Sequence, residues 1–245
     1  LCAPEWPPLC AGPRSGIAPL LAGTSLGTAI ALFVAVPLGL ALAVYVSEYL
    51  PSDKRARVLG VLELFEGIPT VVFGYFALLF VTPLLQKVIP GLSLFNPLSA
   101  GLVMGFAILP YVSNVAADAM QSVPRSIREA AYALGARPYE VALKVVLPAA
   151  LSGVIAAIIL AASRAIGETM IVAIAAGQRP TLTLDPRETI ATMTSYIVQA
   201  ATGDQPTGST AYYALFAVGF TLFLLTLALN VLAQYIVERY RERYE

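Results

Sequence analysis

Five long apolar segments limit what this chain can fold into. A helix needs about 20 mostly apolar residues to cross a bilayer, and each of these segments is long enough. Because lipid offers the backbone no hydrogen-bond partners, such segments cross a membrane as helices. The composition agrees, since 12% of the residues are charged against about 25% in soluble domains. We therefore predict an all-α, polytopic membrane protein with five spans, at residues 20–46, 58–85, 97–118, 147–176 and 211–237.

The basic residues between these spans predict the orientation of the chain. Loops with an excess of Lys and Arg stay in the cytoplasm. Ten of the 15 basic residues lie in segments 47–57 and 119–146 and in the tail from residue 238. The rule therefore predicts an extracytoplasmic tail at 1–15, a transmembrane domain at 16–237 and a cytoplasmic tail at 238–245.

The residue types argue against most catalytic chemistry. The chain has no histidine, which removes the commonest metal ligand and general base. It has no phosphate-binding glycine loop followed by lysine and no nucleophile placed beside a base. We therefore expect no catalytic residue, metal or cofactor in this chain. The net charge of zero argues against nucleic acid as a partner. Cys2 and Cys10 are compatible with an extracytoplasmic disulfide or with two unpaired thiols.

One apolar segment contains an arginine and a glutamate. Arg164 and Glu168 are the only ionisable residues between positions 147 and 177. A charge at the centre of a membrane helix costs roughly 2.5–3.5 kcal/mol, and such residues often mark a transport path. If residues 147–176 form one helix, Ala157, Ala161, Arg164 and Glu168 share a face, beside a row of small residues suited to close packing. The pair then serves an anion path, through the guanidinium fork, or it is an ion pair that holds a kink or a subunit contact.

The cytoplasmic connection, about 121–146, predicts two short helices. Ile127, Ala130, Ala131 and Leu134 follow the spacing of one helical face. Gly135 suits a left-handed helix end, and Pro138 suits the first turn of a second helix. This surface either docks a partner or packs on its own bundle.

The outer connection, 178–210, also predicts a helix. Asp185, Pro186 and Glu188 have the pattern of a helix start, and an apolar stripe follows. An interfacial or re-entrant helix here would dock an outside partner or cap the bundle. Near the cytoplasmic end of the second span, Glu63 and Glu66 either line a water-filled vestibule or extend toward the basic residues at 54–57.

Residues 129–148 read EAAYALGARPYEVALKVVLP. This resembles the EAA loop of ABC importer permeases, in which EAA is followed by three residues, Gly, nine residues, Ile, one residue and Leu-Pro. Val145 stands here in place of the usual Ile. The resemblance implies the MetI-like permease fold and a coupling helix that enters a groove of a separate ATPase. The coupling residues it implies are Arg128, Glu129, Ala130, Ala131 and Gly135.

Within that class the chain resembles the phosphate-specific permeases of the PstC type over about residues 16–237. The strings that carry the resemblance include ELFEGIPTVVFGYFAL and SRAIGETM. The family string Arg-Ala-Leu-Gly-Glu-Thr-Met appears from Arg164 to Met170, with Ile166 for Leu. The resemblance implies that Arg164, Glu168 and Thr169 lie on the substrate path. Two departures are Glu66, where a small residue is common, and residues 1–15, which match nothing in a family that normally has six spans.

The function implied is an ATP-driven importer subunit in the plasma (inner) membrane that moves inorganic phosphate by alternating access. The implied partners are an ATP-binding subunit dimer that binds ATP and Mg²⁺, a second permease subunit (a sister chain or a copy), an extracytoplasmic phosphate-binding protein and membrane lipid. Sulfate, molybdate and phosphonate remain alternative cargoes, although sulfate and molybdate permeases carry Gly-Glu-Phe-Gly in place of Gly-Glu-Thr-Met. Two other classes remain: a proton-coupled secondary transporter and a non-transporting membrane scaffold or sensor.

Overall fold

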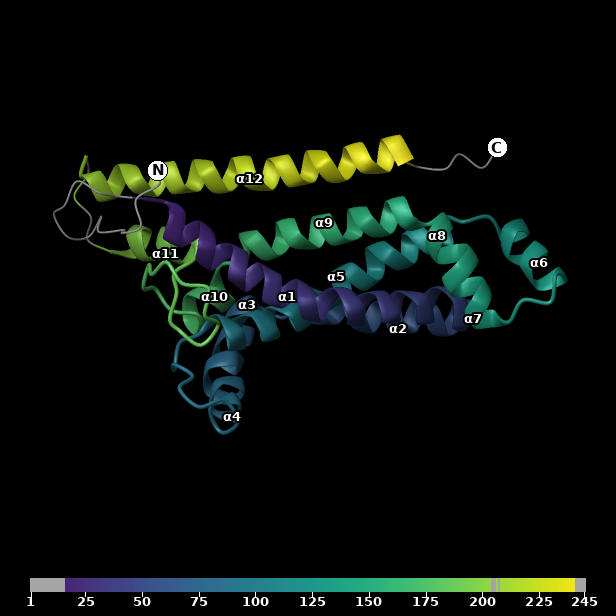
Figure 1. Cartoon of the computed structure of the whole chain (residues 1–245), viewed down its shortest axis with the longest axis horizontal. Coiled ribbons are helices and arrows are strands. Elements are labelled where there is room, and N and C mark those ends of the chain that lie inside the picture. Colours follow the sequence, from purple (N-terminus) through teal and green to yellow (C-terminus); the bar gives the residue numbers. More distant parts are fainter. Residues whose placement is uncertain (1–15, 204–205, 207, 241–245) are drawn as a thin grey trace. The chain divides into compact units, whose positions relative to one another are not determined.

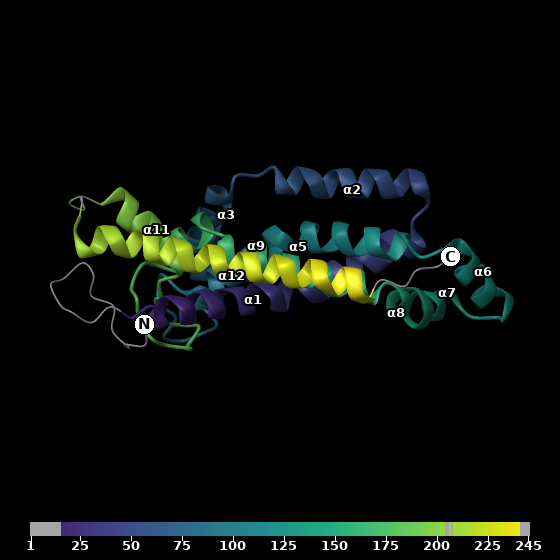
Figure 2. The same ribbon diagram turned by 90° about the horizontal axis from the view of Figure 1, so that it is seen from above.

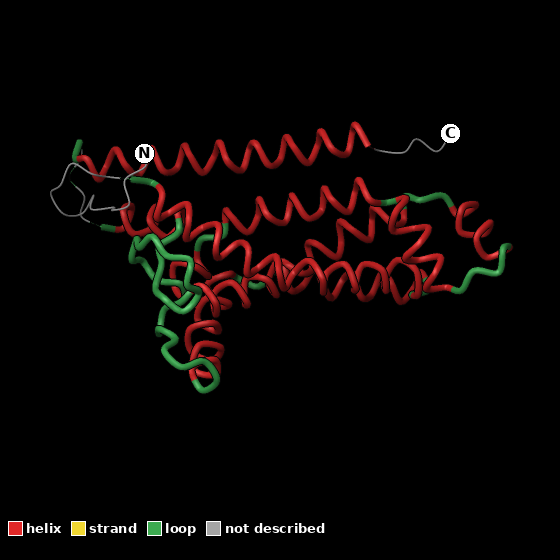
Figure 3. Tube along the Cα trace, in the orientation of Figure 1, coloured by secondary structure: helices red, strands yellow, loops and turns green. Residues whose placement is uncertain are grey.

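The computed structural model describes residues 16–203, 206 and 208–240. The predictions for the tail at 1–15, for a Cys2–Cys10 disulfide and for residues 241–245 lie outside this part. The described residues fold into helices and loops without a β-strand (Figure 3). They form two compact units. Unit 1 comprises the chain up to residue 33 with 69–107 and 164–227, and unit 2 comprises 34–68, 108–163 and the chain from residue 228.

The elements follow one another in the order shown by colour in Figure 1. They are α1 (Ala18–Val44), the π-helical η1 (Tyr45–Tyr49), α2 (Ser52–Glu66), α3 (Thr70–Phe76), the π-helical η2 (Ala77–Val81), α4 (Thr82–Gln86), α5 (Pro97–Gln121), α6 (Arg125–Ala133), α7 (Pro138–Glu140), the π-helical η3 (Val141–Val146), α8 (Leu147–Ala149), α9 (Leu151–Gly167), α10 (Met170–Ala175), α11 (Met193–Thr202) and α12 (Thr210–Tyr240). Helices α1, α5, α9 and α12 contribute residues to both units.

Within the described residues, three helical stretches are long and apolar enough to cross a membrane. They are Ala18–Tyr49, Pro97–Gln121 and Tyr212–Arg239. Two further pairs, Asp53–Glu66 with Thr70–Gln86 and Pro138–Ala149 with Leu151–Gly167, pass the same test together. Counting each pair as one span gives up to five, in agreement with the five predicted segments and with an all-α membrane protein.

The second predicted span, 58–85, is interrupted. Helix α2 ends at Glu66, and α3 begins at Thr70. Pro69 explains the break, because proline disfavours helical geometry at the residue before it and has no N–H to donate. A hydrophobicity pattern alone does not show such a break, since Gly67 and Pro69 are common inside membrane spans.

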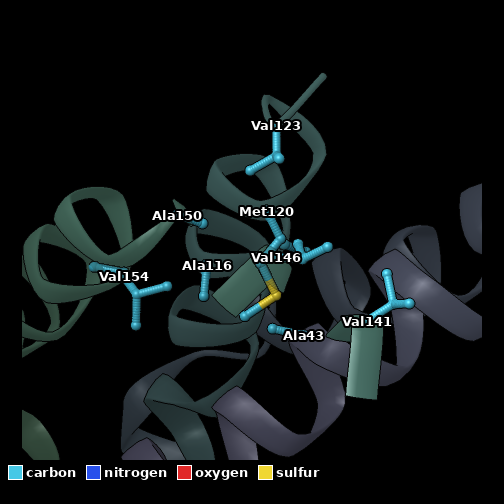
Figure 4. Close-up of a cluster of buried hydrophobic side chains, with 10 residues drawn as sticks. Ala43, Ala116, Met120, Val123, Val141, Val146, Ala150 and Val154 are labelled. Atoms are coloured by element: carbon cyan, nitrogen blue, oxygen red, sulfur yellow. The ribbon is translucent and has the colours of Figure 1, made fainter. Parts of the chain in front are cut away.

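The core of unit 2 is built from small and medium side chains of α1, α5, η3 and α9. Figure 4 shows Met120 of α5 lying among Ala43, Ala116 and Val146. Helices α5 and α9 approach each other closely, since a Cβ added at Gly153 of α9 would lie 2.5 Å from the Cβ of Ala119 of α5. Segment Pro138–Ala149 is bent by 73° from α9, so the fourth predicted span does not begin as one straight helix.

The core of unit 1 joins the start of α1 to α11 and α12. Ile17, Leu20, Met193, Tyr196 and Val218 are buried together there. Helix α11 therefore packs inside its unit, as the predicted structural cap requires.

The predicted start of the outer helix is wrong. Residues 185–192 are not helical, and α11 begins at Met193 after the N-cap Thr192. The Asp185 carboxylate accepts hydrogen bonds from the backbone and the guanidinium of Arg187 instead of capping a helix. The Thr192 hydroxyl accepts from the backbone N–H of Ser195, 3.0 Å away, and supplies the cap.

Candidate functional site

The segment around Glu168 is a break between two helices. Helix α9 ends at Gly167, and α10 begins at Met170. The prediction that Glu168 continues the face of Arg164 on one helix is therefore wrong. The break supplies its own hydrogen bonds: the Glu168 carbonyl accepts from the Thr194 hydroxyl at 2.8 Å, and the Glu168 carboxylate accepts from the backbone N–H groups of Met170 and Ile171.

Arg164 lies in the last turn of α9, where a cation interacts favourably with the helix dipole. The small residues Ala157, Ala161 and Ala165 of the same helix are buried, whereas Arg164 is exposed. The predicted small-residue packing face is therefore present, and Arg164, in the last turn of the helix, is exposed. Thr169 lies in the break, and its hydroxyl donates to the Gly167 carbonyl at 3.1 Å.

A small cavity of about 10 Å³ lies beside the break, within unit 1. Such a volume holds about one water molecule. Glu168 lines it together with four threonines, and the remaining wall is apolar. The Thr28 hydroxyl, in a residue 7% exposed, has no hydrogen-bond partner among the described residues. The lining residues are Thr24, Gly27, Thr28, Met104, Ala165, Ile166, Glu168, Val172, Thr192 and Thr194.

Two of these hydroxyls fix the start of α11. The Thr24 hydroxyl of α1 donates to the Leu20 carbonyl at 2.7 Å and accepts from the Met193 backbone N–H at 3.0 Å. The Thr192 and Thr194 hydroxyls are 2.9 Å apart. This cluster was not predicted from the sequence, because its four threonines come from two segments that lie far apart along the chain.

The connection at residues 121–146 forms the two predicted short helical segments. Helix α6 is followed by Gly135, whose φ of +83° is the predicted left-handed helix end. Figures 1 and 2 both show α6 and α7 together at one end of unit 2. Ile127 and Ala131 pack against the core of that unit, whereas Ala130 and Leu134 are exposed, Leu134 to 90%. Of the four residues predicted to share this face, two therefore pack against the core and two lie on the surface.

Arg128 of α6 is directed at its own unit. Its Nε donates to Oε2 of Glu48 at 3.0 Å, and its Nη2 donates to Oε1 at 2.9 Å. The guanidinium also donates to the carbonyls of Met120 and Val123 at the end of α5. The Glu48 side chain is only 6% exposed. A buried, bidentate arginine–carboxylate pair is among the strongest polar contacts in proteins.

Arg55 adds a second link beside this pair. Its guanidinium donates to the carbonyls of Val46, Ser47 and Leu50 and to Oε1 of Gln121. These contacts lie on the wall of a cavity of about 380 Å³ within unit 2. Its lining is Ser47, Glu48, Arg55, Gln121, Arg125, Arg128, Glu129 and Tyr132.

Two of the predicted site residues, Glu63 and Glu66, were expected to line a vestibule. Glu63 is exposed and Glu66 half-buried, and neither lines the two cavities described above, so the vestibule stays a prediction. Outside the spans, hydrogen bonds from Arg187 lower the pKa of Asp185 to about 2. Among the described residues, no group of three or more His, Cys, Asp or Glu side chains is placed to hold a metal ion.

Comparison with known proteins places these features in a family. Residues 35–242 match the family described as "Binding-protein-dependent transport system inner membrane component". The chain is 31% identical to the probable ABC transporter permease protein YqgH of Bacillus subtilis, over 96% of this chain and 76% of that protein. It is 32% identical to the phosphate transport system permease protein PstC of Xylella fastidiosa (96% and 77%). It is 34% identical to the phosphate transport system permease protein PstC 1 of Mycobacterium tuberculosis (93% and 74%).

Solved structures show the same fold. The MetNI methionine ABC transporter in an inward-facing conformation gives a TM-score of 0.60 at 18% identity, over 90% of this chain and 94% of that one. A bacterial alginate ABC transporter, solved with a periplasmic protein that carries an alginate pentasaccharide, gives 0.59 at 16% identity, over 92% and 79%. The chain therefore belongs to the family of binding-protein-dependent transport system inner membrane components and has the fold of ABC transporter permeases.

Proposed function

We propose that this chain is a permease subunit of an ATP-driven importer that moves inorganic phosphate across the plasma membrane by alternating access. The observation that carries the cargo assignment is the similarity to phosphate permeases, at about 30% identity over nearly the whole chain. ATP hydrolysis takes place on a separate ATP-binding subunit dimer, so the chain itself is a transport subunit.

The cytoplasmic connection is the docking surface for that ATPase. Glu129, Ala130 and Gly135 are exposed there, and Tyr132, Leu134 and Tyr139 add apolar area that is 45–90% exposed. Exposed apolar patches rimmed by polar residues are typical of protein–protein contacts. On the other side of the membrane, connection 178–210 receives the phosphate-binding protein.

The substrate path lies between this chain and a second permease subunit. Arg164 supports this arrangement, because it is exposed on the surface of α9 while the small residues of the same helix are buried. Its guanidinium fork suits an oxyanion, and binding there has to be weak enough to release the ion. Glu168 and Thr169 shape the neighbouring break, and Glu168 holds the start of α10 through its carboxylate.

The proposal is tested by anion uptake into proteoliposomes that contain the whole transporter, with the ATPase, the second permease and the binding protein. Labelled phosphate, sulfate and molybdate are compared in the presence and absence of ATP. Arg164→Ala is compared with Arg57→Ala, which removes an exposed arginine from α2. We expect ATP-dependent phosphate uptake that falls roughly tenfold or more in Arg164→Ala, as loss of a charge-assisted hydrogen bond implies, and that persists in Arg57→Ala.

The other outcomes separate the parts of the proposal. Uptake of sulfate or molybdate in place of phosphate would overturn the cargo. Uptake driven by an ion gradient without ATP would contradict the proposed ATPase partner. It would instead support a proton-coupled secondary transporter. Equal uptake by the parent and Arg164→Ala, with the ATPase still bound, would remove Arg164 from the substrate path.

A further inference from the structure

Arg128 belongs to the segment that docks the ATPase, yet its side chain is turned away from that surface. The side chain is 17% exposed, and its guanidinium donates four hydrogen bonds to its own chain. Two go to Glu48, which lies 80 residues earlier in the sequence, and two go to carbonyls at the end of α5. A guanidinium used in this way is not available to a partner protein.

Glu48 receives this contact at the end of the first span. It lies in η1, which continues α1, and its Oε1 also accepts from the Ser47 hydroxyl at 2.7 Å. Separating a buried carboxylate from its arginine leaves an uncompensated charge. A displacement of α6 therefore either carries Glu48 with it or breaks a contact that the chain strongly favours.

We propose that Arg128 is a positioning residue that transmits movement of α6 to the cytoplasmic end of α1 through Glu48. This inference rests on the proposed function, in which the ATPase moves α6. The exposed residues of α6 contact the ATPase, and Arg128 conveys the displacement into the permease. Arg55 holds the last carbonyls of the same helix end and Gln121 of α5, so α1 and α5 receive the displacement together.

The test compares mild substitutions that keep the site polar. Arg128→Lys keeps the charge and loses the bidentate fork, and Glu48→Gln keeps an acceptor oxygen and loses the charge. The control is Arg57→Gln, which removes an exposed arginine from α2, outside the docking surface. Each variant is reconstituted as the whole transporter, and three quantities are measured: ATPase bound per permease, ATP hydrolysed, and labelled phosphate taken up.

We expect Arg128→Lys and Glu48→Gln to bind the ATPase and hydrolyse ATP as the parent does, while uptake per ATP falls roughly tenfold. The double variant should lose no more than the stronger single variant, because both changes break the same link. A loss of bound ATPase in Arg128→Lys, without a matching loss in Glu48→Gln, would overturn the inference in favour of direct contact. Uptake that falls only in proportion to the assembled complex would also overturn it, since the pair would then be merely structural.

A second measurement does not depend on the cargo. Tyr49→Cys places a thiol at the end of η1, in a background with Cys2 and Cys10 replaced by serine, and a maleimide reports its accessibility. We expect trapping with ATP and vanadate to change the labelling rate in the parent and to have little effect in Glu48→Gln. An equal change in both would overturn the inference. Vesicles that take up no phosphate would overturn the proposed cargo, and the thiol response would still decide the role of Arg128.

Discussion

Two glutamates near the membrane-spanning helices are held in different ways. Glu48, in unit 2, is bound by the guanidinium of Arg128, which comes from a distant part of the chain. Glu168, in unit 1, accepts hydrogen bonds from backbone N–H groups two and three residues further on. The first contact joins two elements, whereas the second stabilises the start of the next helix.

This difference indicates which site tolerates movement. The Glu48 contact fixes the distance between α6 and the end of α1, because a buried ion pair is costly to separate. The contacts of the Glu168 carboxylate are local, so they persist if the segment moves as a whole. The structure thus places a tight link between α6 and the end of α1, and a locally capped break near Arg164.

The largest effect is expected from removing the tight link. Arg128→Ala should lower the free energy of unfolding by about 3–5 kcal/mol, because Glu48 stays buried without its partner. Lys144→Ala, in the exposed pair, should cost far less, because water and salt screen an exposed ion pair. Unfolding of both variants in mixed micelles, followed by circular dichroism, measures the two values. Similar values would show that burial does not distinguish the two pairs.

A smaller effect is expected from the threonines beside the break. Thr24→Val should cost about 1–3 kcal/mol, because the buried Met193 N–H loses its acceptor. Thr28→Val is the matched control, and it should be nearly neutral because the hydroxyl it removes has no partner among the described residues. The same unfolding measurement applies. A large loss in Thr28→Val would show that its hydroxyl is engaged, for example by a water in the small cavity.

The local contacts of Glu168 should contribute less to stability than the Glu48 link. Glu168→Ala should cost about 1 kcal/mol, the usual value for loss of a helix cap, and Glu168→Gln should cost less because its amide oxygen can still accept. Thermal unfolding in detergent ranks these variants against the parent. A cost as large as that of Arg128→Ala would contradict the distinction between the two glutamates.

The smallest effect is expected at the exposed pair Asp185–Arg187. The pKa of Asp185 is lowered from 3.8 to about 2 by hydrogen bonds from Arg187. A lowered pKa means that the pair stabilises the folded state above pH 3.8 and that this contribution is lost as the pH falls toward 2. The stability difference between the parent and Asp185→Asn should therefore be present at pH 6 and should shrink between pH 4 and pH 2. A difference that does not change with pH would contradict the assignment.

The sequence predicted the helices well and their interruptions poorly. Length and hydrophobicity located α1, α5 and α12, because a membrane span must satisfy its own backbone. The breaks at Gly67–Pro69 and at Glu168–Thr169 were missed, since glycine and proline also occur inside spans. The second break depends on Thr194, whose hydroxyl reaches the Glu168 carbonyl from 26 residues away, and no local pattern reports such a partner.

The candidate site was predicted only in part, again because distant partners leave no local sequence pattern. Arg164 and Glu168 were found because charges in an apolar segment are conspicuous, and Gly135 because its place after the predicted short helix suited a left-handed end. Their arrangement was not predictable, since it depends on where α9 ends. Arg128 was placed in the coupling helix, but its partner Glu48 lies 80 residues earlier, beyond the range of any helical periodicity.

The hydrogen bonds of Arg55 constrain the connection between η1 and α2. Leu50 and Pro51 form a connection that looks like an ordinary surface turn, where insertions are usually tolerated. Yet Arg55, in the first turns of α2, supplies the donors for the last carbonyls of the preceding helix. One residue inserted after Leu50 would shift the donors away from those carbonyls, so this turn has a fixed length although it is short and lies at the surface.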